Sequence, residues 1–107
     1  MVFIETSAFT KAITALLDDA EYSALQEALA ADPAAGDRIL GTAGLRKLRW
    51  AASGRGKRGG MRLIYYWIVS KDQIFLLLAY PKNRQDDLTA DQKRLLSELV
   101  KKELANG

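Results

Sequence analysis

Apolar side chains recur at helical spacing in the first third of the chain. The first apolar stripe consists of Phe9, Ile13, Leu16 and Leu17. Thr6 or Ser7 is placed to cap the helix that carries this stripe. The second stripe consists of Tyr22, Leu25, Ala28 and Leu29. Asp18 or Asp19 can cap this second helix, which should end before Asp32-Pro33 because the residue preceding a proline disfavours helix. The pattern therefore predicts two consecutive helices forming a hairpin.

Beyond Gly44 the period changes from helical to alternating. In residues 45–52, Leu48 and Trp50 point one way while Lys47 and Arg49 point the other. The next two segments, 61–69 and 74–80, are apolar on both faces, which is typical of central strands. Residues 70–73 between them predict a hairpin turn.

Pairing across this turn has a consequence for two polar residues. Strand residues equidistant from a turn face each other, so Arg62 should lie within about one residue of Tyr80. A last helix is indicated by a capping box at Thr89 and Gln92 and by a stripe that follows it. That stripe consists of Leu95, Leu96, Leu99 and Val100.

Together with a short strand at residues 2–4, these elements predict a single α+β domain spanning residues 1–107. We expect an N-terminal helical hairpin packed on a small, mostly antiparallel twisted sheet, with a C-terminal helix. A length of 107 residues is enough for one compact domain with a modest core.

Positive charge is concentrated in one short window. Seven of the sixteen basic residues lie within residues 46–62, and no acidic residue lies among them. They are Arg46, Lys47, Arg49, Arg55, Lys57, Arg58 and Arg62. Residues 1–45, by contrast, carry two basic and seven acidic groups, an asymmetry that the net charge of +3 conceals. Because like charges repel, a fold that confines the basic window needs an anionic ligand or partner, which suggests a phosphate site.

The amino-acid composition excludes several kinds of catalytic and metal-binding site. The chain has neither cysteine nor histidine, which excludes disulfides, thiolate nucleophiles, histidine bases and most zinc sites. Catalysis would have to use Lys, Arg, Tyr, Asp or Glu, and no cofactor is expected. No apolar run approaches the roughly 20 residues that span a bilayer. The first residues also lack the basic-then-apolar order of a secretion signal, so a cytoplasmic location is expected, without a membrane partner.

Residues 53–60 form a glycine-rich loop that carries three of the cations. Gly54, Gly56 and Gly59 match the G-x-G-x-x-G string of dinucleotide-binding proteins. That fingerprint requires a helix to follow, whereas a strand is predicted from Met61, so the dinucleotide interpretation is rejected. The remaining alternatives are a flexible connection kept soluble by surface charge, or a basic loop that approaches a nucleic-acid backbone.

Other residues near the basic window permit more than one interpretation. Tyr80 ends its strand and can present its hydroxyl outward, while Lys82 and Asn83 are either substrate-contacting or ordinary turn residues. The aromatic run 65–67 is assigned mainly to the core. Asp86 and Asp87 precede the Thr89 cap and are interpreted as helix-entry charges in preference to an acid and base pair. No helix-turn-helix signature is found in the sequence.

Three segments carry a resemblance to a known family. They are Gly41-Thr-Ala-Gly-Leu-Arg-Lys-Leu-Arg49, Gly54-Arg-Gly-Lys-Arg-Gly-Gly-Met-Arg-Leu-Ile-Tyr-Tyr66, and Tyr80-Pro-Lys-Asn83 followed by Asp87-Leu88. This combination resembles the HigB branch of the RelE/ParE toxin superfamily of bacterial toxin-antitoxin operons. Three positions depart from relatives: Ala43 stands where glycine is common, Arg49 where the RelE branch has lysine, and Thr89 near a tyrosine of that branch.

The resemblance implies a ribosome-dependent messenger-RNA endonuclease that cuts the codon in the ribosomal A site. In similar toxins a ribose 2′-hydroxyl attacks the adjacent phosphate, which requires a base, a cation for the developing charge and an acid for the leaving oxygen. Repulsion among cations favours a neutral amine, so Lys47 or Lys57 is a candidate base. Arg62 is assigned to phosphate stabilisation.

The remaining site residues are assigned to the leaving group or to the RNA chain. Lys82, Tyr80 or Arg58 would protonate the leaving group or place the substrate. The residues expected to contact RNA are Arg46, Arg49, Arg55, Arg58 and Asn83. The expected partners are the ribosome with its message and a DNA-binding, HigA-like antitoxin. Two alternatives stay open, a toxin of the ParE type that inhibits DNA gyrase without cutting RNA and a simple RNA-binding module, because a fold alone does not decide activity.

Overall fold

The computed structural model describes residues 1–51 and 60–106. In these residues the chain is α+β, as expected, with three α-helices and a five-stranded mixed sheet. The elements are β1 (Val2–Glu5), α1 (Ser7–Leu16), α2 (Asp19–Ala31), β2 (Asp37–Arg38), β3 (Arg46–Trp50), β4 (Met61–Ile68), β5 (Gln73–Pro81) and α3 (Ala90–Asn106). A short 3₁₀ turn, Val69–Lys71, joins β4 to β5.

The strand order is β1-β5-β4-β3-β2, so the two strands predicted to be central do lie inside the sheet. β1 pairs with β5 in parallel, and all other neighbours are antiparallel. β3 is shorter than the predicted segment 45–52. The sequence pattern does not predict β2, because a strand of two exposed residues has no detectable alternation.

The pairing of β4 with β5 confirms the predicted neighbourhood of Arg62 and Tyr80, which are direct partners. The connection and pairing of β4 and β5 differ from those of a simple hairpin in two respects. The turn begins earlier than predicted, as a 3₁₀ turn followed by Asp72 in the left-handed region (φ 51°). A bulge at Ile64 and Tyr65 then shifts the register by one residue. The turn and the bulge together set the register in which Arg62 pairs with Tyr80.

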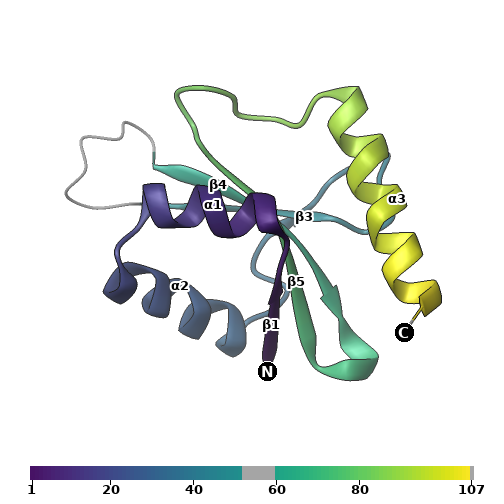
Figure 1. The fold of residues 1–107 in the computed structure, drawn as a ribbon, viewed down its shortest axis with the longest axis horizontal. Coiled ribbons are helices and arrows are strands. Elements are labelled where there is room, and N and C mark those ends of the chain that lie inside the picture. The colour runs from purple at the N-terminus through teal and green to yellow at the C-terminus, as the bar shows by residue number, and fades with distance from the viewer. Residues whose placement is uncertain (52–59, 107) are drawn as a thin grey trace.

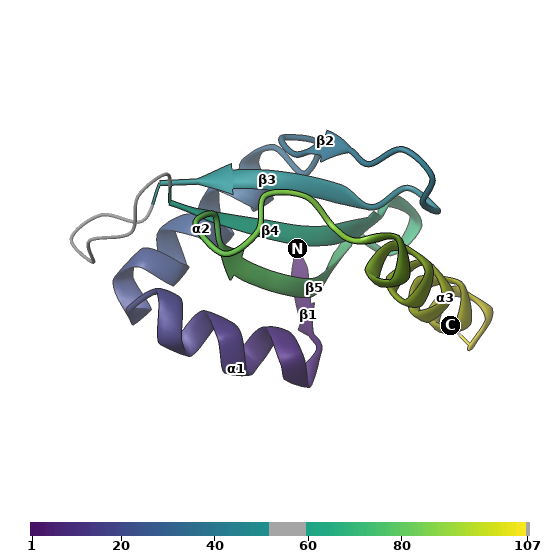
Figure 2. The same cartoon turned by 90° about the horizontal axis from the view of Figure 1, so that it is seen from above.

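Helices cover both faces of the sheet (Figures 1 and 2). α1 and α2 lie on one face, where their apolar stripes form a core with alternate residues of β4 and β5. This cluster contains Phe9, Ile13, Leu16, Leu17, Leu25, Leu29, Met61, Leu63, Tyr65, Ile74, Leu76 and Ala79. α3 lies on the opposite face over a second cluster, which contains Leu45, Ile64, Phe75, Leu77, Tyr80, Leu88 and Val100. Each such Leu or Ile contributes about 1.5–3 kcal/mol on burial.

Side-chain caps begin each helix where the sequence indicated. The Thr6 hydroxyl accepts a hydrogen bond from the Phe9 amide at 3.0 Å. Asp18 and Glu21 form a reciprocal capping box at the start of α2. At α3 the predicted box is confirmed, since the Gln92 amide donates to Thr89 at 3.1 Å and the Thr89 amide donates back at 3.0 Å.

The stripe predicted for α3 is only half correct. Leu96 and Val100 pack against the second cluster, whereas Leu95 and Leu99 are exposed by 59% and 37%. α3 lies toward one end of the strands (Figure 2). Only part of its predicted stripe is covered by the sheet. Across the described residues, no helix combines the length and apolarity that crossing a bilayer requires.

Gly60 closes the strand end that holds the candidate site, and we expect it to be intolerant of a side chain. Its φ is +70°, and a Cβ there would lie 2.2 Å from the Trp50 carbonyl oxygen. Gly60→Ala should therefore lower the free energy of unfolding by more than the 1–2 kcal/mol, roughly, of left-handed strain alone. Gly41→Ala is the matched control, because its φ is +76° with open space around it. Urea unfolding that found equal losses for the two variants would contradict this prediction.

Candidate nucleic-acid interface

Antiparallel pairing of β3 with β4 places three cations of the basic window on one face of the sheet. Arg49 is the direct partner of Arg62, and Lys47 is the partner of Ile64. Residues two apart on a strand share a face, so Lys47, Arg49 and Arg62 all lie on the α3 side, where Ile64 packs. Like charges directly opposite each other destabilise a sheet. The arrangement therefore needs compensation from elsewhere in the chain.

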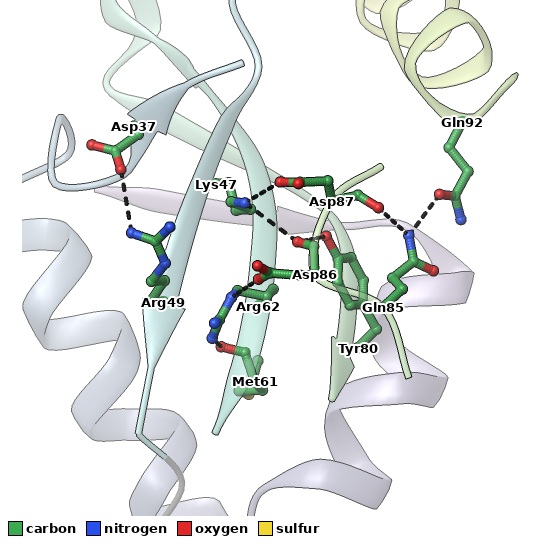
Figure 3. A network of polar contacts seen from close by, with 10 residues as sticks. All are labelled: Asp37, Lys47, Arg49, Met61, Arg62, Tyr80, Gln85, Asp86, Asp87 and Gln92. Atoms are coloured by element: carbon green, nitrogen blue, oxygen red, sulfur yellow. Dashed lines mark hydrogen bonds and ion pairs between the residues drawn. The ribbon is translucent and has the colours of Figure 1, made fainter. Parts of the chain in front are cut away.

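Three carboxylates supply this compensation, each from a segment distant in sequence. Arg62 Nε lies 2.8 Å from Asp86 Oδ1, and Lys47 Nζ lies 2.5 Å from Asp87 Oδ1. Arg49 Nη1 is 3.8 Å from Asp37 Oδ2 on β2. Figure 3 shows Arg62 and Lys47 both directed at the connection from β5 to α3, residues 82–89, while Arg49 is directed away from it toward β2. We call residues 82–89 the β5–α3 connection.

Arg62 is the most deeply placed of these cations. Its side chain is only 6% exposed, against 46% for that of Asp86. The guanidinium also donates to the Met61 carbonyl at 3.3 Å. The hydrogen bond from Arg62 is the main reason that the pKa of Asp86 is lowered from its usual value, with Lys47 and Lys82 adding to the effect. Asp86 is therefore a carboxylate at neutral pH.

The structure corrects the interpretation of the aspartates and of Tyr80. Asp86 and Asp87 are not simple helix-entry charges, because they pair with Arg62 and Lys47. Tyr80 does not present its hydroxyl to solvent: the residue is 7% exposed and its hydroxyl donates to the Asp86 carbonyl at 3.2 Å. Lys47 also donates to this carbonyl, at 3.3 Å. The β5–α3 connection thus covers three of the residues that the sequence assigned to catalysis.

Arg46, which the sequence placed among the residues expected to contact RNA, does not lie on the same face as Lys47, Arg49 and Arg62. Period 2 directs it to the opposite face, beside Tyr65. There its Nη1 donates to the carbonyls of Gly36 at 2.8 Å and Ala34 at 3.4 Å. Tyr65 holds the same loop, since it accepts from the Gly36 amide at 2.8 Å. Arg46 fastens the loop between α2 and β2 to the sheet.

The other predicted site residues divide into two groups. Lys82 and Asn83 are exposed in the turn after β5, and the Lys82 amide donates to the Gly60 carbonyl at 3.0 Å. This bond holds the turn against the strand end that carries Arg62. Arg55, Lys57 and Arg58 fall outside the described residues, so their expected roles stay predictions.

A hollow of about 380 Å³ adjoins Lys47. Residues from β2, β3, the β5–α3 connection and the first turn of α3 line it, and Arg49 and Lys93 add positive charge to its wall. Ile39, Leu40 and Leu88 contribute apolar surface. In the described ranges, no group of three or more acidic side chains is placed to hold a metal ion. Arg38 is a further cation of this lining, and Asp37 and Asp87 are its two carboxylates, so cations outnumber acidic groups around the hollow.

The two arginines of β3 should respond differently to substitution. Arg46→Met removes charge-assisted hydrogen bonds to two carbonyls and should lower the free energy of unfolding by about 1–2 kcal/mol. Arg49→Met removes only an exposed ion pair at 3.8 Å, so its effect should stay within about 0.5 kcal/mol. Urea unfolding of both variants checks this. Equal stabilities of the two would contradict the structural role of Arg46.

Tyr80 should stay neutral well above neutral pH. Burial chiefly, with the nearby Asp87 and Asp86, raises its pKa to about 12. Near pH 10 an ordinary tyrosine is about half ionised. The tyrosinate absorbance of the native protein at that pH should therefore be the same as that of Tyr80→Phe. In denaturant, where the burial is lost, the tyrosinate absorbance of the natural protein should exceed that of Tyr80→Phe by the contribution of one half-ionised tyrosine. A native difference of that size would show that Tyr80 ionises normally.

A comparison with known families agrees with these features. The model of the RelE toxin of the RelE/RelB toxin-antitoxin system matches residues 6–106. The match extends from the cap of α1 to the end of α3 and includes the three clustered cations and the β5–α3 connection. It covers nearly all of the chain. The protein therefore belongs to the RelE toxin family of toxin-antitoxin systems.

Proposed function

We propose that the protein is a ribosome-dependent messenger-RNA endonuclease of the HigB branch of this superfamily, which blocks translation by cutting the message in the A site. The single observation that carries the proposal is the placement of Arg62. It lies almost buried on the sheet, next to Lys47 and Arg49 on the same face. A guanidinium held in this way is pre-organised to stabilise charge developing on a phosphate.

The proposed reaction is attack of a ribose 2′-hydroxyl on the adjacent phosphorus. The new O–P bond closes a cyclic phosphate, the bond to the 5′-oxygen breaks, and this oxygen takes up a proton. Arg62 stabilises the negative charge on the phosphate oxygens. Tyr80 keeps its proton at neutral pH, because its pKa is raised to about 12. To serve the leaving oxygen, its hydroxyl would exchange its hydrogen bond to the Asp86 carbonyl for one to RNA. Lys82, at the exposed turn beside this strand end, is a second proton donor.

The base is assigned to Lys47 or Lys57. Lys47 is within hydrogen-bond distance of the β5–α3 connection, and its nearest charged neighbour is a carboxylate and not another cation. Activation of Lys47 by repulsion among cations, as expected from the sequence, therefore requires that no anion pairs with it. If an RNA phosphate takes the place of Asp87, Lys47 stays charged and binds RNA, and Lys57 is the base. Arg49, Asn83, Arg55 and Arg58 are proposed to contact the RNA backbone, and the hollow beside Lys47 offers room for a nucleotide next to the cut.

The proposal includes two kinds of macromolecular partner. The ribosome presents the message, since a codon held in the A site is the substrate. A HigA-like antitoxin that carries the DNA-binding domain is the proposed inhibitor, and the cytoplasm, where translation takes place, is the proposed location. Membership of a toxin-antitoxin family supports the existence of such an inhibitor.

Arg62→Ala should abolish message cleavage, because it removes the proposed charge stabilisation. Loss of one such donor typically costs about a hundred- to a thousandfold in rate. Primer extension on a message in translation should show cuts inside A-site codons with the natural protein and none with the variant. Lys11→Ala is the matched control, since Lys11 lies on α1, on the far face of the sheet, and its loss should leave the cuts unchanged.

Two outcomes would count against the proposal. An intact message during growth arrest, with signs of DNA damage, would favour a toxin of the ParE type that acts on gyrase. RNA binding that weakens steeply with salt, without growth arrest, would favour a plain RNA-binding module.

A further inference from the structure

Asp86 and Asp87 are adjacent in sequence, but the structure holds them in different ways. Asp86 is fixed at three points. Its carboxylate accepts from Arg62 Nε at 2.8 Å, and its carbonyl accepts from the Tyr80 hydroxyl at 3.2 Å and from Lys47 Nζ at 3.3 Å. The Arg62 side chain is itself nearly buried, at 6% exposed, whereas that of Asp86 is 46% exposed. Such a contact defines one orientation of the guanidinium.

The Asp87 side chain makes a single described contact, to Lys47 Nζ. Its side chain is 80% exposed, whereas that of Lys47 is 12% exposed. The ammonium group is therefore held in the protein, and its carboxylate partner approaches it from solvent. An exposed ion pair of this kind is weak and exchanges readily for another anion.

We propose that Asp86 is a positioning residue that orients Arg62 for catalysis, while Asp87 is an exchangeable counter-ion that the RNA phosphate displaces from Lys47. This inference rests on the proposed function, because it assigns roles in the same site. It goes further by giving two neighbouring and chemically identical side chains opposite effects: Asp86 supports cleavage, whereas Asp87 opposes RNA binding.

The geometry of the guanidinium explains the role of Asp86. A carboxylate on Nε locks rotation about the end of the side chain and sets the plane in which the terminal nitrogens lie. Without it, Arg62 would keep its charge and its hydrogen bond to the Met61 carbonyl but lose the carboxylate that sets the direction of Nε. A displacement of about 1 Å from a productive geometry can reduce a rate about a hundredfold. An asparagine at this position keeps an oxygen that can accept from Nε, so it should preserve much of the orientation.

The role of Asp87 follows from electrostatics. RNA must bring a phosphate to Lys47 against a carboxylate that already neutralises it. Removal of this carboxylate should strengthen RNA binding and leave the orientation of Arg62 unchanged, since Asp87 does not contact Arg62 in any described hydrogen bond or ion pair.

The decisive experiment compares Asp86→Ala, Asp86→Asn and Asp87→Ala on programmed ribosomes. Asp86→Ala should lower the cleavage rate at saturating protein about a hundredfold, and Asp86→Asn should restore most of this loss. Asp87→Ala should keep that rate and lower the half-saturating concentration about two- to fivefold. Asp91→Ala is the control for loss of one negative charge, because within residues 1–51 and 60–106 Asp91 forms an ion pair with Arg94 alone, and both side chains are exposed. It should change neither quantity.

Two measurements without ribosomes separate this inference from the proposed function. The Nε–H signal of Arg62 in a ¹H–¹⁵N spectrum should be protected from exchange in the natural protein, in Asp86→Asn and in Asp87→Ala, and should lose protection in Asp86→Ala. A short single-stranded RNA should bind Asp87→Ala about two- to fivefold more tightly than the natural protein at fixed salt. Urea unfolding identifies any variant that is not folded.

Each result decides between the two proposals. If the natural protein cuts the message and both alanine variants behave like it, the positioning and counter-ion roles are wrong and the nuclease stands. If the natural protein does not cut, the nuclease is wrong. The roles of the two aspartates are then decided by the two measurements without ribosomes. An Arg62 signal that stays protected in Asp86→Ala would overturn the positioning role, and unchanged or weaker RNA binding by Asp87→Ala would overturn the counter-ion role.

Discussion

Three positive charges lie side by side on one face of the sheet, and this constraint governs the rest of the site. Arg49 faces Arg62 directly across β3 and β4, and Lys47 is one position along on the same face. Such a row repels itself, so the fold must supply negative charge from other segments. It does so with Asp37 from β2 and with Asp86 and Asp87 from the β5–α3 connection. Of these carboxylates, we propose that an RNA phosphate displaces Asp87 alone, while Asp86 stays on Arg62.

Hydrophobic packing makes this arrangement possible. β4 and β5 are covered on both faces, so Arg62 can lie in the interior at the end of a rigid strand and not at a flexible tip. The β5–α3 connection is held at both ends, by the Lys82 amide on Gly60 and by the Thr89 capping box. Its acidic residues are therefore delivered to defined positions. Rigid elements place catalytic groups more accurately than loops do.

The two faces of β3 carry basic residues with different roles. Lys47 and Arg49 belong to the candidate interface, while Arg46 fastens a loop on the other side. A count of basic residues treats all three alike. Only the alternation of the strand, combined with the knowledge of which face carries α3, separates a charge at the candidate interface from a structural one.

Much of the fold could be predicted from local patterns. Apolar stripes at helical spacing and capping residues predicted α1, α2 and α3, and segments that are apolar on both faces predicted β4 and β5. Each of these signals is contained within a few neighbouring residues. β2 was missed, since two exposed residues carry no period, and half of the α3 stripe was misassigned because nothing local shows how wide a band the sheet covers.

The partnership of Arg62 with Tyr80 was also open to prediction, since pairing across one turn links sequence distance to spatial position. The partnerships of the cations with their carboxylates were not. Arg62 and Asp86 are separated by 24 residues, and Lys47 and Asp87 by 40. The sequence by itself determined that a dense cationic window must meet negative charge. Only the tertiary structure decided that part of this charge comes from the chain's own aspartates, because a contact between distant segments depends on how whole layers pack and leaves no periodic trace in the residues that make it.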